Sequence, residues 1–365
     1  MKLGMFMMPN HPRHRTYADA HAHDLDTLIF ADRLGYVEGW VGEHFTSKRE
    51  PVPCPDILIA QALVKTERIR LGAGAFLLPY HVPAELAARI SYLDHISGGR
   101  FMAGIGAGGL PTDYELFGVD GAHGEHREMM NESIDLIVKL WTSTGSFEHQ
   151  GKHYKGGRTE GFPKLGLGFH LQPLTKPHPT VAIAGLNEYS PTLKFAGKRG
   201  FIPMSLAWSP DYLLTHWQAY KEGCDSVGRA PDRAEWRVGV ETYIAETDAE
   251  ARRRAINGEI GTSWRTYLLP MLKEWGMLGT CKHDQSVADS DVTVEYLVDK
   301  VWIVGSPKTV TEKLDAMRRK VGQFGCLLQV IYDHLEEFDA YRWSLTALAQ
   351  EVLPNFAEPE RAAAE

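Results

Sequence analysis

Glu43 and His44 are the adjacent side chains that most directly indicate chemistry in this sequence, because they closely follow the short apolar run Glu38–Val41. A carboxylate at the end of a buried strand is costly unless it meets a hydrogen-bond donor or a polar ligand. An imidazole titrates near neutral pH, so it can act as a general acid, a general base or a substrate-orienting group. Glu43 is open to two interpretations: a carboxylate that faces a ligand, and one that closes hydrogen bonds between neighbouring strands.

Glycines mark a second region where a ligand could approach the backbone. Gly72 and Gly74 interrupt the apolar run Ile69–Leu77, and a glycine cluster surrounds the end of the run Phe101–Ile105, namely Gly104, Gly106, Gly108 and Gly109. Backbone without side chains lets a flat ligand or a phosphate come close. The alternative is that the glycines only relieve packing between crowded strands, but their presence at two neighbouring strand ends favours a ligand.

Ser190-Pro191 offers a third chemical signal, a hydroxyl at the N-cap and a proline in the first turn of a predicted helix. The free N–H groups at such a helix start bind phosphate well. An ordinary helix cap explains the same two residues. A similar pair, Ser306-Pro307, precedes the eighth predicted strand and would lie at the opposite face of a barrel, so the pattern alone does not assign a phosphate site.

The 16 histidines raise the question of a metal site. Barrel enzymes that bind zinc or iron in this way carry an H-x-H pair at the end of the first strand. Here His21-x-His23 follows that strand by about a dozen residues, and no partner set of carboxylates accompanies it. The cysteines show no C-x-x-C spacing. We therefore expect no bound metal and no disulfide framework.

Short apolar runs alternate with helical patterns along the whole chain, and these elements must position the residues above. Eight strands are predicted, at Lys2–Met8, Glu38–Val41, Ile69–Leu77, Phe101–Ile105, Thr180–Ala184, Phe201–Leu206, Trp236–Ala245 and Gln323–Tyr332. This alternation is typical of an α/β fold, a (β/α)8 TIM barrel that occupies residues 1–365 as a single domain. A doubly wound Rossmann sheet would need G-x-G-x-x-G after the first strand, and that loop contains no glycine.

Two stretches interrupt the alternation. Thr142–Pro179, before the fifth strand, is rich in Gly, His, Lys and Pro and predicts an excursion with a small hairpin. Gly261–Thr293, after the seventh strand, mixes aromatic and polar residues and predicts a mobile lid insertion at 261–293. The site of such a barrel is built from the loops at the C-terminal ends of the strands. That rule brings the strand-end residues above to one face of the molecule.

Composition narrows the class of protein. The 365 residues are 44% hydrophobic and 24% charged, with a formal net charge of −8, as in an ordinary soluble globular protein. Without a basic stripe, nucleic acid is not an expected partner. No apolar run approaches the roughly 18 residues of a membrane span, and the N-terminal run is too short for a signal peptide. We therefore expect a cytoplasmic protein that does not bind a membrane.

Several segments together resemble the bacterial luciferase-like, flavin-dependent monooxygenases. They are Gly42-Glu43-His44, Leu71–Ala87 (LGAGAFLLPYHVPAELA), Ser97–Gly108 (SGGRFMAGIGAG), Asp113–Gly118 (DYELFG) and Val304–Val310 (VGSPKTV). The family fold is a (β/α)8 barrel with insertions. The FLLPYHVP and GIGAG segments are most similar to the limonene and diketocamphane (type II Baeyer–Villiger) monooxygenases.

The resemblance implies a two-component enzyme with His44 as the catalytic residue. Reduced FMN (FMNH2), supplied by a separate reductase that uses NAD(P)H, would react with O2 to give a C4a-(hydro)peroxyflavin, which transfers one oxygen atom to the substrate. A non-prolyl cis peptide under the flavin ring would join Gly74 to Ala75. Further flavin contacts are implied for Glu43, Gly106, Asp113 and Trp208.

The flavin phosphate is the point at which the resemblance is incomplete. Ala107 stands where the luciferases have a phosphate-binding arginine. The phosphate contacts are therefore assigned to the loop before the Ser190 helix, at Gly185, Leu186 and Ser190.

The resemblance also implies the substrate class and the assembly. A bulky pocket suits a small hydrophobic substrate, a cyclic or terpenoid ketone or an aromatic compound, and its expected lining is His11, Phe76, Tyr80, Trp264 and Trp275. A homodimer is expected. Two alternatives stay open: an oxidoreductase of the same fold that uses the deazaflavin F420 for hydride transfer, and a non-catalytic flavin-binding barrel.

Overall fold

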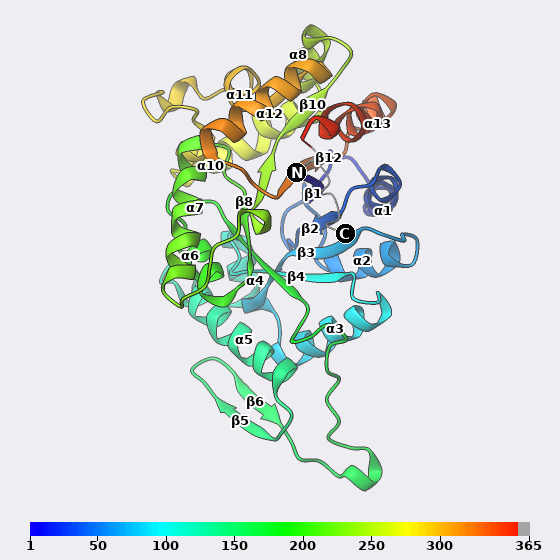
Figure 1. The fold of residues 1–365 in the computed structure, drawn as a ribbon, viewed down its shortest axis with the longest axis vertical. Coiled ribbons are helices and arrows are strands. Elements are labelled where there is room, and N and C mark those ends of the chain that lie inside the picture. The colour runs from blue at the N-terminus through cyan, green and yellow to red at the C-terminus, as the bar shows by residue number, and fades with distance from the viewer. Residues whose placement is uncertain (357–365) are drawn as a thin grey trace, which may run out of the picture.

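The short apolar runs pair edge to edge into a closed ring of parallel strands in the computed structural model, which describes residues 1–356 (Figure 1). Around the ring the order is β1-β12-β9-β8-β7-β4-β3-β2. The chain passes between parallel neighbours through helices, so this is the (β/α)8 barrel with insertions that the sequence predicts. The barrel strands are β1 (Lys2–Asn10), β2 (Glu38–Val41), β3 (Arg70–Leu77), β4 (Phe101–Gly106), β7 (Thr180–Gly185), β8 (Ile202–Ser205), β9 (Arg237–Val240) and β12 (Cys326–Tyr332).

The helices outside the barrel begin and end at identifiable signals. The Thr16 side chain accepts a hydrogen bond from the Asp19 N–H at the start of α1 (Tyr17–Leu34), and Gly35 ends that helix at a φ of 87°. The other long helices are α2 (Pro55–Leu63), α3 (Pro83–Ile96), α5 (Glu125–Thr142), α6 (Pro191–Arg199), α7 (Pro210–Asp225), α8 (Asp248–Asn257), α12 (Pro307–Val321) and α13 (Phe338–Ala347).

The predicted seventh strand, Trp236–Ala245, is in fact two strands in two sheets. β9 belongs to the barrel, whereas β10 (Thr242–Ile244) leaves it and pairs in parallel with β11 (Ile303–Gly305). Glu241 lies at the break, where its carbonyl accepts the Ile303 N–H at 2.9 Å. The apolar pattern is continuous across the break because both strands are buried, so the sequence alone does not reveal a change of partner.

The region predicted as a lid, 261–293, is mostly helical. It contains α9 (Glu259–Ser263), a π-helical turn (Trp264–Leu268), α10 (Leu269–Glu274) and the 3-10 turns Leu278–Cys281 and Asp289–Asp291. The short helices α4 (Pro111–Phe117) and α11 (Val294–Lys300) also lay outside the predicted elements. These short helices escape a periodicity argument because only a few residues of each are buried.

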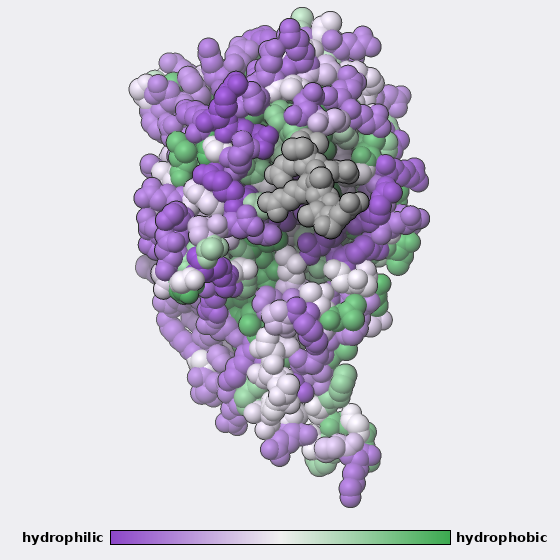
Figure 2. Space-filling model, in the orientation of Figure 1, coloured by the Kyte–Doolittle hydropathy of each residue, from purple (hydrophilic) through white to green (hydrophobic). Residues whose placement is uncertain are grey.

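The earlier excursion contains the small hairpin that the sequence predicts, formed by β5 (Phe147–Gln150) and β6 (Lys155–Arg158). Figure 1 shows it projecting below the barrel, next to α5. Most of the face seen in Figure 2 is hydrophilic, with small apolar areas between. No helix in residues 1–356 is long and apolar enough to cross a bilayer.

The barrel interior is filled, so a ligand can enter only at an end. A compact group of apolar side chains occupies it: Phe6, Trp40, Met102, Ala182, Ile202, Met204, Cys326 and Leu328. Below them Arg237 pairs with Glu38, with 3.0 Å between Nη2 and Oε2. A larger apolar layer lies between the strands and the helices. A packed interior of this kind leaves the strand ends as the place for a site.

Candidate active site

A cavity of about 950 Å³ opens at the C-terminal ends of the barrel strands. Its volume lies in the range of pockets that enclose a cofactor or a drug-sized ligand. The wall combines strand ends, the starts of α5 and α6, and the segment 267–277. Of the residues predicted for the site, those that line this cavity are Glu43, His44, Gly74, Ala75, Gly106, Leu186, Ser190, Trp208 and Trp275.

One wall of the cavity is bare backbone from β3 and β4. The peptide bond between Gly74 and Ala75 is cis, as the resemblance implies. A Cβ on Gly106 would lie 3.3 Å from the Ala75 Cβ, and Gly108 adopts a φ of +87° that side chains disfavour. The ends of these two strands therefore form a flat surface that a planar ring can approach closely.

The Glu43 carboxylate both faces the cavity and forms hydrogen bonds with neighbouring parts of the barrel, so both interpretations from the sequence apply. It lines the cavity, and its Oε2 accepts the backbone N–H of Leu77 at 2.7 Å. Nε2 of His81 lies 3.0 Å from both carboxylate oxygens, while its Nδ1 lies 3.2 Å from Nη2 of Arg89. Because a guanidinium only donates, Nδ1 of His81 accepts and Nε2 carries the hydrogen donated to Glu43. The carboxylate is thus fixed at the cavity wall by a defined network.

His44 lies between two acidic side chains. Its Nδ1 is 3.4 Å from Oδ2 of Asp113, and its Nε2 is 3.5 Å from Oε2 of Glu50. Burial by itself would lower the pKa of His44, but the hydrogen bond to Asp113 and the nearby negative charges outweigh it, so the pKa is raised. The surroundings of His44 therefore favour the charged form of its ring beside the cavity.

Asp113 supports His44 from behind the cavity wall rather than lining it. The carboxylate is fully buried and accepts the Thr46 N–H at 2.9 Å. Burial alone would raise the pKa of Asp113, but the hydrogen bonds from His44 and Thr46 lower it. Asp113 is therefore a lasting negative charge beside the imidazole.

Glu50 and Tyr267 are cavity residues that sequence reasoning missed. The Tyr267 hydroxyl donates to Oε2 of Glu50 at 2.8 Å, and this contact joins the π-helical turn to the loop after β2. Neither residue ends a predicted strand, and neither belongs to a recognisable motif. Nothing in the sequence pattern signals this pair.

Three cations at the other end of the cavity were also missed. Arg127 comes from the start of α5, and Lys194 and Lys198 come from α6. The two lysines are four residues apart on the helix that begins with Ser190, so they share one face of it. That spacing is the signal that could have found them.

The loop before α6 is held in place from the back by His216 of α7. Nε2 of His216 lies 2.8 Å from the Asn187 carbonyl oxygen, and Nδ1 lies 3.0 Å from the Ser205 Oγ. Burial lowers the pKa of His216 to about 4, so the ring is neutral. Nε2 then donates to Asn187 and Nδ1 accepts from Ser205, which fixes the loop that carries Leu186 and Ser190.

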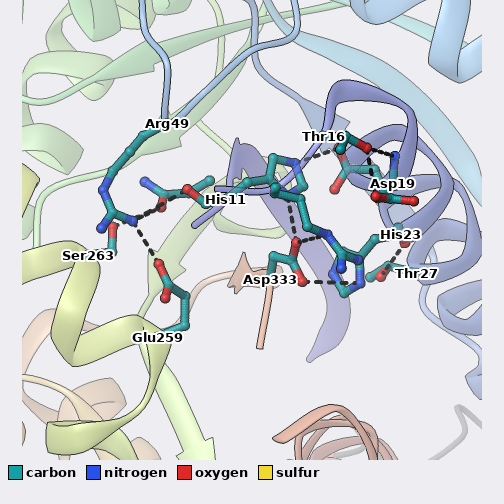
Figure 3. Close-up of polar contacts among 12 residues, drawn as sticks. His11, Thr16, Asp19, His23, Thr27, Arg49, Glu259, Ser263 and Asp333 are labelled. Atoms are coloured by element: carbon teal, nitrogen blue, oxygen red, sulfur yellow. Dashed lines mark hydrogen bonds and ion pairs between the residues drawn. The ribbon is translucent and has the colours of Figure 1, made fainter. Parts of the chain in front are cut away.

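His11 does not line the cavity. Its ring lies between two carboxylates, with Nδ1 2.8 Å from Asp333 and Nε2 3.1 Å from Asp24 (Figure 3). Burial opposes the charged form, but these two contacts raise the pKa of His11 to about 9. Successive residues of a strand point to opposite sides, so the neighbouring Asn10 takes the cavity position instead.

Four other predicted residues also lie behind the wall. Phe76 is fully buried in the layer between the strands and the helices. Tyr80 stacks on Phe117 with 4.5 Å between ring centroids. Trp264 lies behind Trp208, with 4.8 Å between ring centroids. Gly185 ends β7 next to the cavity residue Leu186 without lining the cavity itself.

No group of three or more His, Cys, Asp or Glu side chains in residues 1–356 has the arrangement of a metal site.

Comparison with known proteins agrees with this geometry. The family model described as luciferase-like monooxygenase matches residues 1–323. The chain is 33% identical to 2,5-diketocamphane 1,2-monooxygenase 1 of Pseudomonas putida over 97% of this chain and 99% of that protein. It is 30% identical to limonene 1,2-monooxygenase of Rhodococcus erythropolis over 94% of this chain and 84% of that one.

A solved structure gives the same result. The oxygenating constituent of 3,6-diketocamphane monooxygenase from Pseudomonas putida, a type II Baeyer–Villiger monooxygenase in complex with FMN, superposes with a TM-score of 0.92. It is 32% identical and covers 99% of both chains. The chain therefore belongs to the luciferase-like monooxygenase family and is an enzyme, a monooxygenase.

Proposed function

We propose that this enzyme binds reduced FMN in the cavity and uses it with O2 to insert one oxygen atom into a small hydrophobic substrate. The observation that carries the proposal is one cavity that joins a bare, flat wall at Gly74-Ala75 and Gly106 to a cationic end at Arg127, Lys194 and Lys198. A flat wall suits an isoalloxazine ring and a cationic end suits a phosphate. The similar oxygenating constituent was solved with FMN.

The phosphate contacts differ from those implied by the resemblance alone. Ala107 lines the cavity but carries no charge. Arg127 of α5 and the two lysines of α6 supply positive charge instead, although Lys194 also pairs with Glu222 at 3.0 Å, and Ser190 contributes its hydroxyl at the start of α6. Charge-assisted hydrogen bonds of this kind suit a phosphate dianion, and the start of a helix adds to the attraction. These four residues would hold the phosphate.

The reduced flavin supplies two electrons, so that one atom of O2 enters the substrate and the other leaves as water. The protein supplies position and a proton. His44 holds its proton beside the flat wall, where Asp113 and Glu50 stabilise the charged ring. Glu43, fixed by Leu77 and His81, lines the same region.

The remainder of the cavity would take the substrate. Its wall is largely apolar, which suits a cyclic or terpenoid ketone or an aromatic compound, and includes Phe6, Met8, Leu206, Trp208, Leu268, Met271 and Val330. Two similar relatives are named for diketocamphane and limonene, a bicyclic ketone and a terpene, which supports the same class. A flavin-sized cavity, in a sequence that shows no Rossmann fingerprint, supports delivery of electrons from NAD(P)H by a separate reductase.

A homodimer is part of the same proposal. Apolar side chains are exposed on α2 and α3: Ile57, Val64, Tyr92 and Ile96. Such neighbouring apolar side chains suit a contact with a second copy. Light scattering on the full-length protein tests this, and a monomeric mass would contradict it.

The test of the proposed function uses chemically reduced FMN, 18O2 and a panel of bicyclic ketones, terpenes and aromatic compounds. We expect oxidised FMN and a product that carries one 18O atom. A product without 18O, formed with reduced F420 in the absence of O2, would favour the F420 alternative and refute the monooxygenase proposal. Flavin binding without turnover of any compound would favour the non-catalytic barrel.

The cationic end has its own test. The double variant Arg127→Met/Lys194→Met should weaken the binding of FMN but leave the binding of riboflavin unchanged, because riboflavin lacks the phosphate. Equal losses for FMN and riboflavin would place the phosphate elsewhere. The matched variant Lys221→Met removes a surface lysine of α7 that pairs with Asp225 and should change neither.

A further inference from the structure

Asn10 is a polar exception on an apolar part of the cavity wall. It ends β1, lines the cavity and is 3% exposed. Phe6 and Met8, earlier on the same strand, line the cavity too. A carboxamide in such surroundings is costly unless its polar atoms find partners. Its hydrogen bonds therefore decide its role.

The oxygen of the Asn10 carboxamide is fully engaged on the protein side. Oδ1 accepts from the Ser263 Oγ at 2.9 Å and from Nη1 of Arg49 at 3.4 Å. A guanidinium can only donate, so the atom that faces Arg49 must be the oxygen and not the nitrogen. This fixes the orientation of the amide group.

The nitrogen of the same carboxamide is left without a partner. Nδ2 carries two hydrogens, and no acceptor within residues 1–356 receives either of them. It is also not one of the side-chain nitrogen and oxygen atoms that are both inaccessible to solvent and without a hydrogen-bond partner. Since the residue is almost fully buried and lines the cavity, the free donor opens onto the cavity.

The groups that orient Asn10 are themselves rigidly held. Nη1 of Arg49 donates to Glu259 at 2.7 Å, and its Nη2 donates to the Thr266 Oγ1 at 3.0 Å. Figure 3 shows Arg49 reaching across to Glu259 and Ser263 from the loop after β2. Ser263 and Glu259 both belong to α9, so this helix supplies one partner of Asn10 and one partner of Arg49. The amide donor is preorganised before a ligand arrives.

Two tyrosine hydroxyl groups of the cavity wall already donate their hydrogens to carboxylates of the protein. The Tyr332 hydroxyl, on the same side of the barrel, donates to Glu241 at 2.7 Å. The Tyr267 hydroxyl donates to Glu50 at 2.8 Å. Asn10 thus keeps a donor where these two phenols do not. A donor-only group recognises an acceptor such as a carbonyl oxygen and gives nothing to a hydrocarbon.

The position of Asn10 points to the substrate rather than the flavin. In the ring of strands, β1 lies opposite β7, and β12 lies opposite β4. Gly106 of the flat wall ends β4, opposite the strand of Tyr332, and the loop before α6 follows β7, opposite the strand of Asn10, whereas Gly74 and Ala75 on β3 are two strands away from Asn10. A ligand against Asn10 therefore faces a flavin ring placed on the flat wall.

We propose that Asn10 is a specificity-determining residue whose Nδ2 donates a hydrogen bond to the carbonyl oxygen of a ketone substrate. The inference rests on the proposed function, since it assigns the substrate class for that same cavity. Arg49 and Ser263 are positioning residues, because they hold the oxygen of the amide and turn its nitrogen toward the substrate.

The experiment measures binding without turnover, in protein loaded with oxidised FMN. The probes are norbornanone, 13C-labelled at the carbonyl carbon, and the hydrocarbon norbornane. We expect infrared difference spectra to show a carbonyl stretch at lower frequency for bound ketone than for ketone in an apolar solvent. The variants Asn10→Leu and Asn10→Asp should lose this shift and about 2- to 12-fold of ketone affinity, the range of one neutral hydrogen bond. Norbornane affinity should not change.

Two variants distinguish the loss of the amide donor from misfolding and from a general disturbance of the cavity. Asn10→Asp keeps the shape and the acceptor for Arg49 and Ser263, so it tests the donor even where Asn10→Leu fails to fold. Asn131→Leu makes the same exchange at the α5 end of the cavity and should keep the carbonyl shift.

The outcomes separate this inference from the proposed function. A wild-type protein without a carbonyl shift, or variants at Asn10 that keep it, would overturn the role of Asn10 even if the enzyme oxygenates ketones. A shift that depends on Asn10 in a protein that never incorporates 18O would support the Asn10 contact and refute the oxygenase.

Discussion

Replacing His11 by glutamine should remove a specific pH dependence of stability. The two carboxylates around His11 raise its pKa from 6.5 to about 9 in the folded protein. In the unfolded chain the value returns to about 6.5. A raised pKa means that the folded state binds the proton more tightly, so the stabilisation is fully present below pH 6.5. It is lost as the pH rises through about 9.

The magnitude follows from the size of the shift. The difference, 9 − 6.5, is about 2.5 pH units, and each unit corresponds to about 1.4 kcal/mol, which gives about 3.5 kcal/mol in full. His216 and His334 do not disturb this window, because burial lowers their pKa values to about 4 and about 3, so both stay neutral above pH 6.5. His44, whose pKa is also raised, contributes equally to wild type and variant.

The assay is chemical denaturation followed by circular dichroism at pH 6.5 and pH 9.5. The wild-type free energy of unfolding should fall between these two values by about 3 kcal/mol more than that of His11→Gln. The same exchange at His14, which is exposed, is the matched control and should leave the wild-type pH dependence intact. Equal pH dependence in wild type and His11→Gln would refute the argument that Asp24 and Asp333 hold a charged imidazole.

Three further predictions concern the cavity. Asp113→Asn removes the main partner that raises the pKa of His44, so the part of the kcat/KM–pH profile that reports His44 should move to lower pH. If that part of the profile does not move, the titrating group is not His44. Gly106→Leu places a branched side chain on the flat wall, with its Cβ 3.3 Å from the Ala75 Cβ. This variant should weaken FMN binding by roughly tenfold or more, with little change in the midpoint of unfolding. If fluorescence titrations show unchanged FMN affinity, the flavin does not lie on this wall. Trp264→Phe takes away the indole N–H that lies 2.9 Å from the Tyr332 hydroxyl and should cost about 1–3 kcal/mol of stability, whereas an unchanged denaturation midpoint would show that bond to be dispensable.

Much of the fold was predictable because its signals are local. Each barrel strand is a short apolar run bounded by turn residues, and each outer helix has its own periodicity and start signal, as at Pro83 and Ser306-Pro307. The alternation of eight such units leaves few topologies. The strand-end rule then brought Glu43, His44 and the glycines of β3 and β4 to one face without any structure.

The features that the sequence analysis predicted wrongly or missed share one physical cause. Each depends on partners that are distant in the sequence. Trp236–Ala245 looks like one strand, but its second half pairs with β11, some sixty residues on. The helical character of 259–281 arises from packing of short segments over the barrel mouth, where no segment is long enough to show a periodic face. Arg127 of α5 and Lys194 of α6 line the same cavity, although they are more than sixty residues apart in the sequence.

His11 and Asn10 show the division most clearly. The sequence by itself determined that β1 ends in polar residues at the catalytic face, because the apolar run stops there. Only the tertiary structure decided which of the two faces the cavity, since that depends on how β1 pairs with β12, and this pairing shifts register between Phe6 and Asn10. A shift of one residue exchanges the two faces of a strand, and nothing in a single short strand fixes that register. The packing of the whole barrel turned His11 to its carboxylates and Asn10 to the cavity.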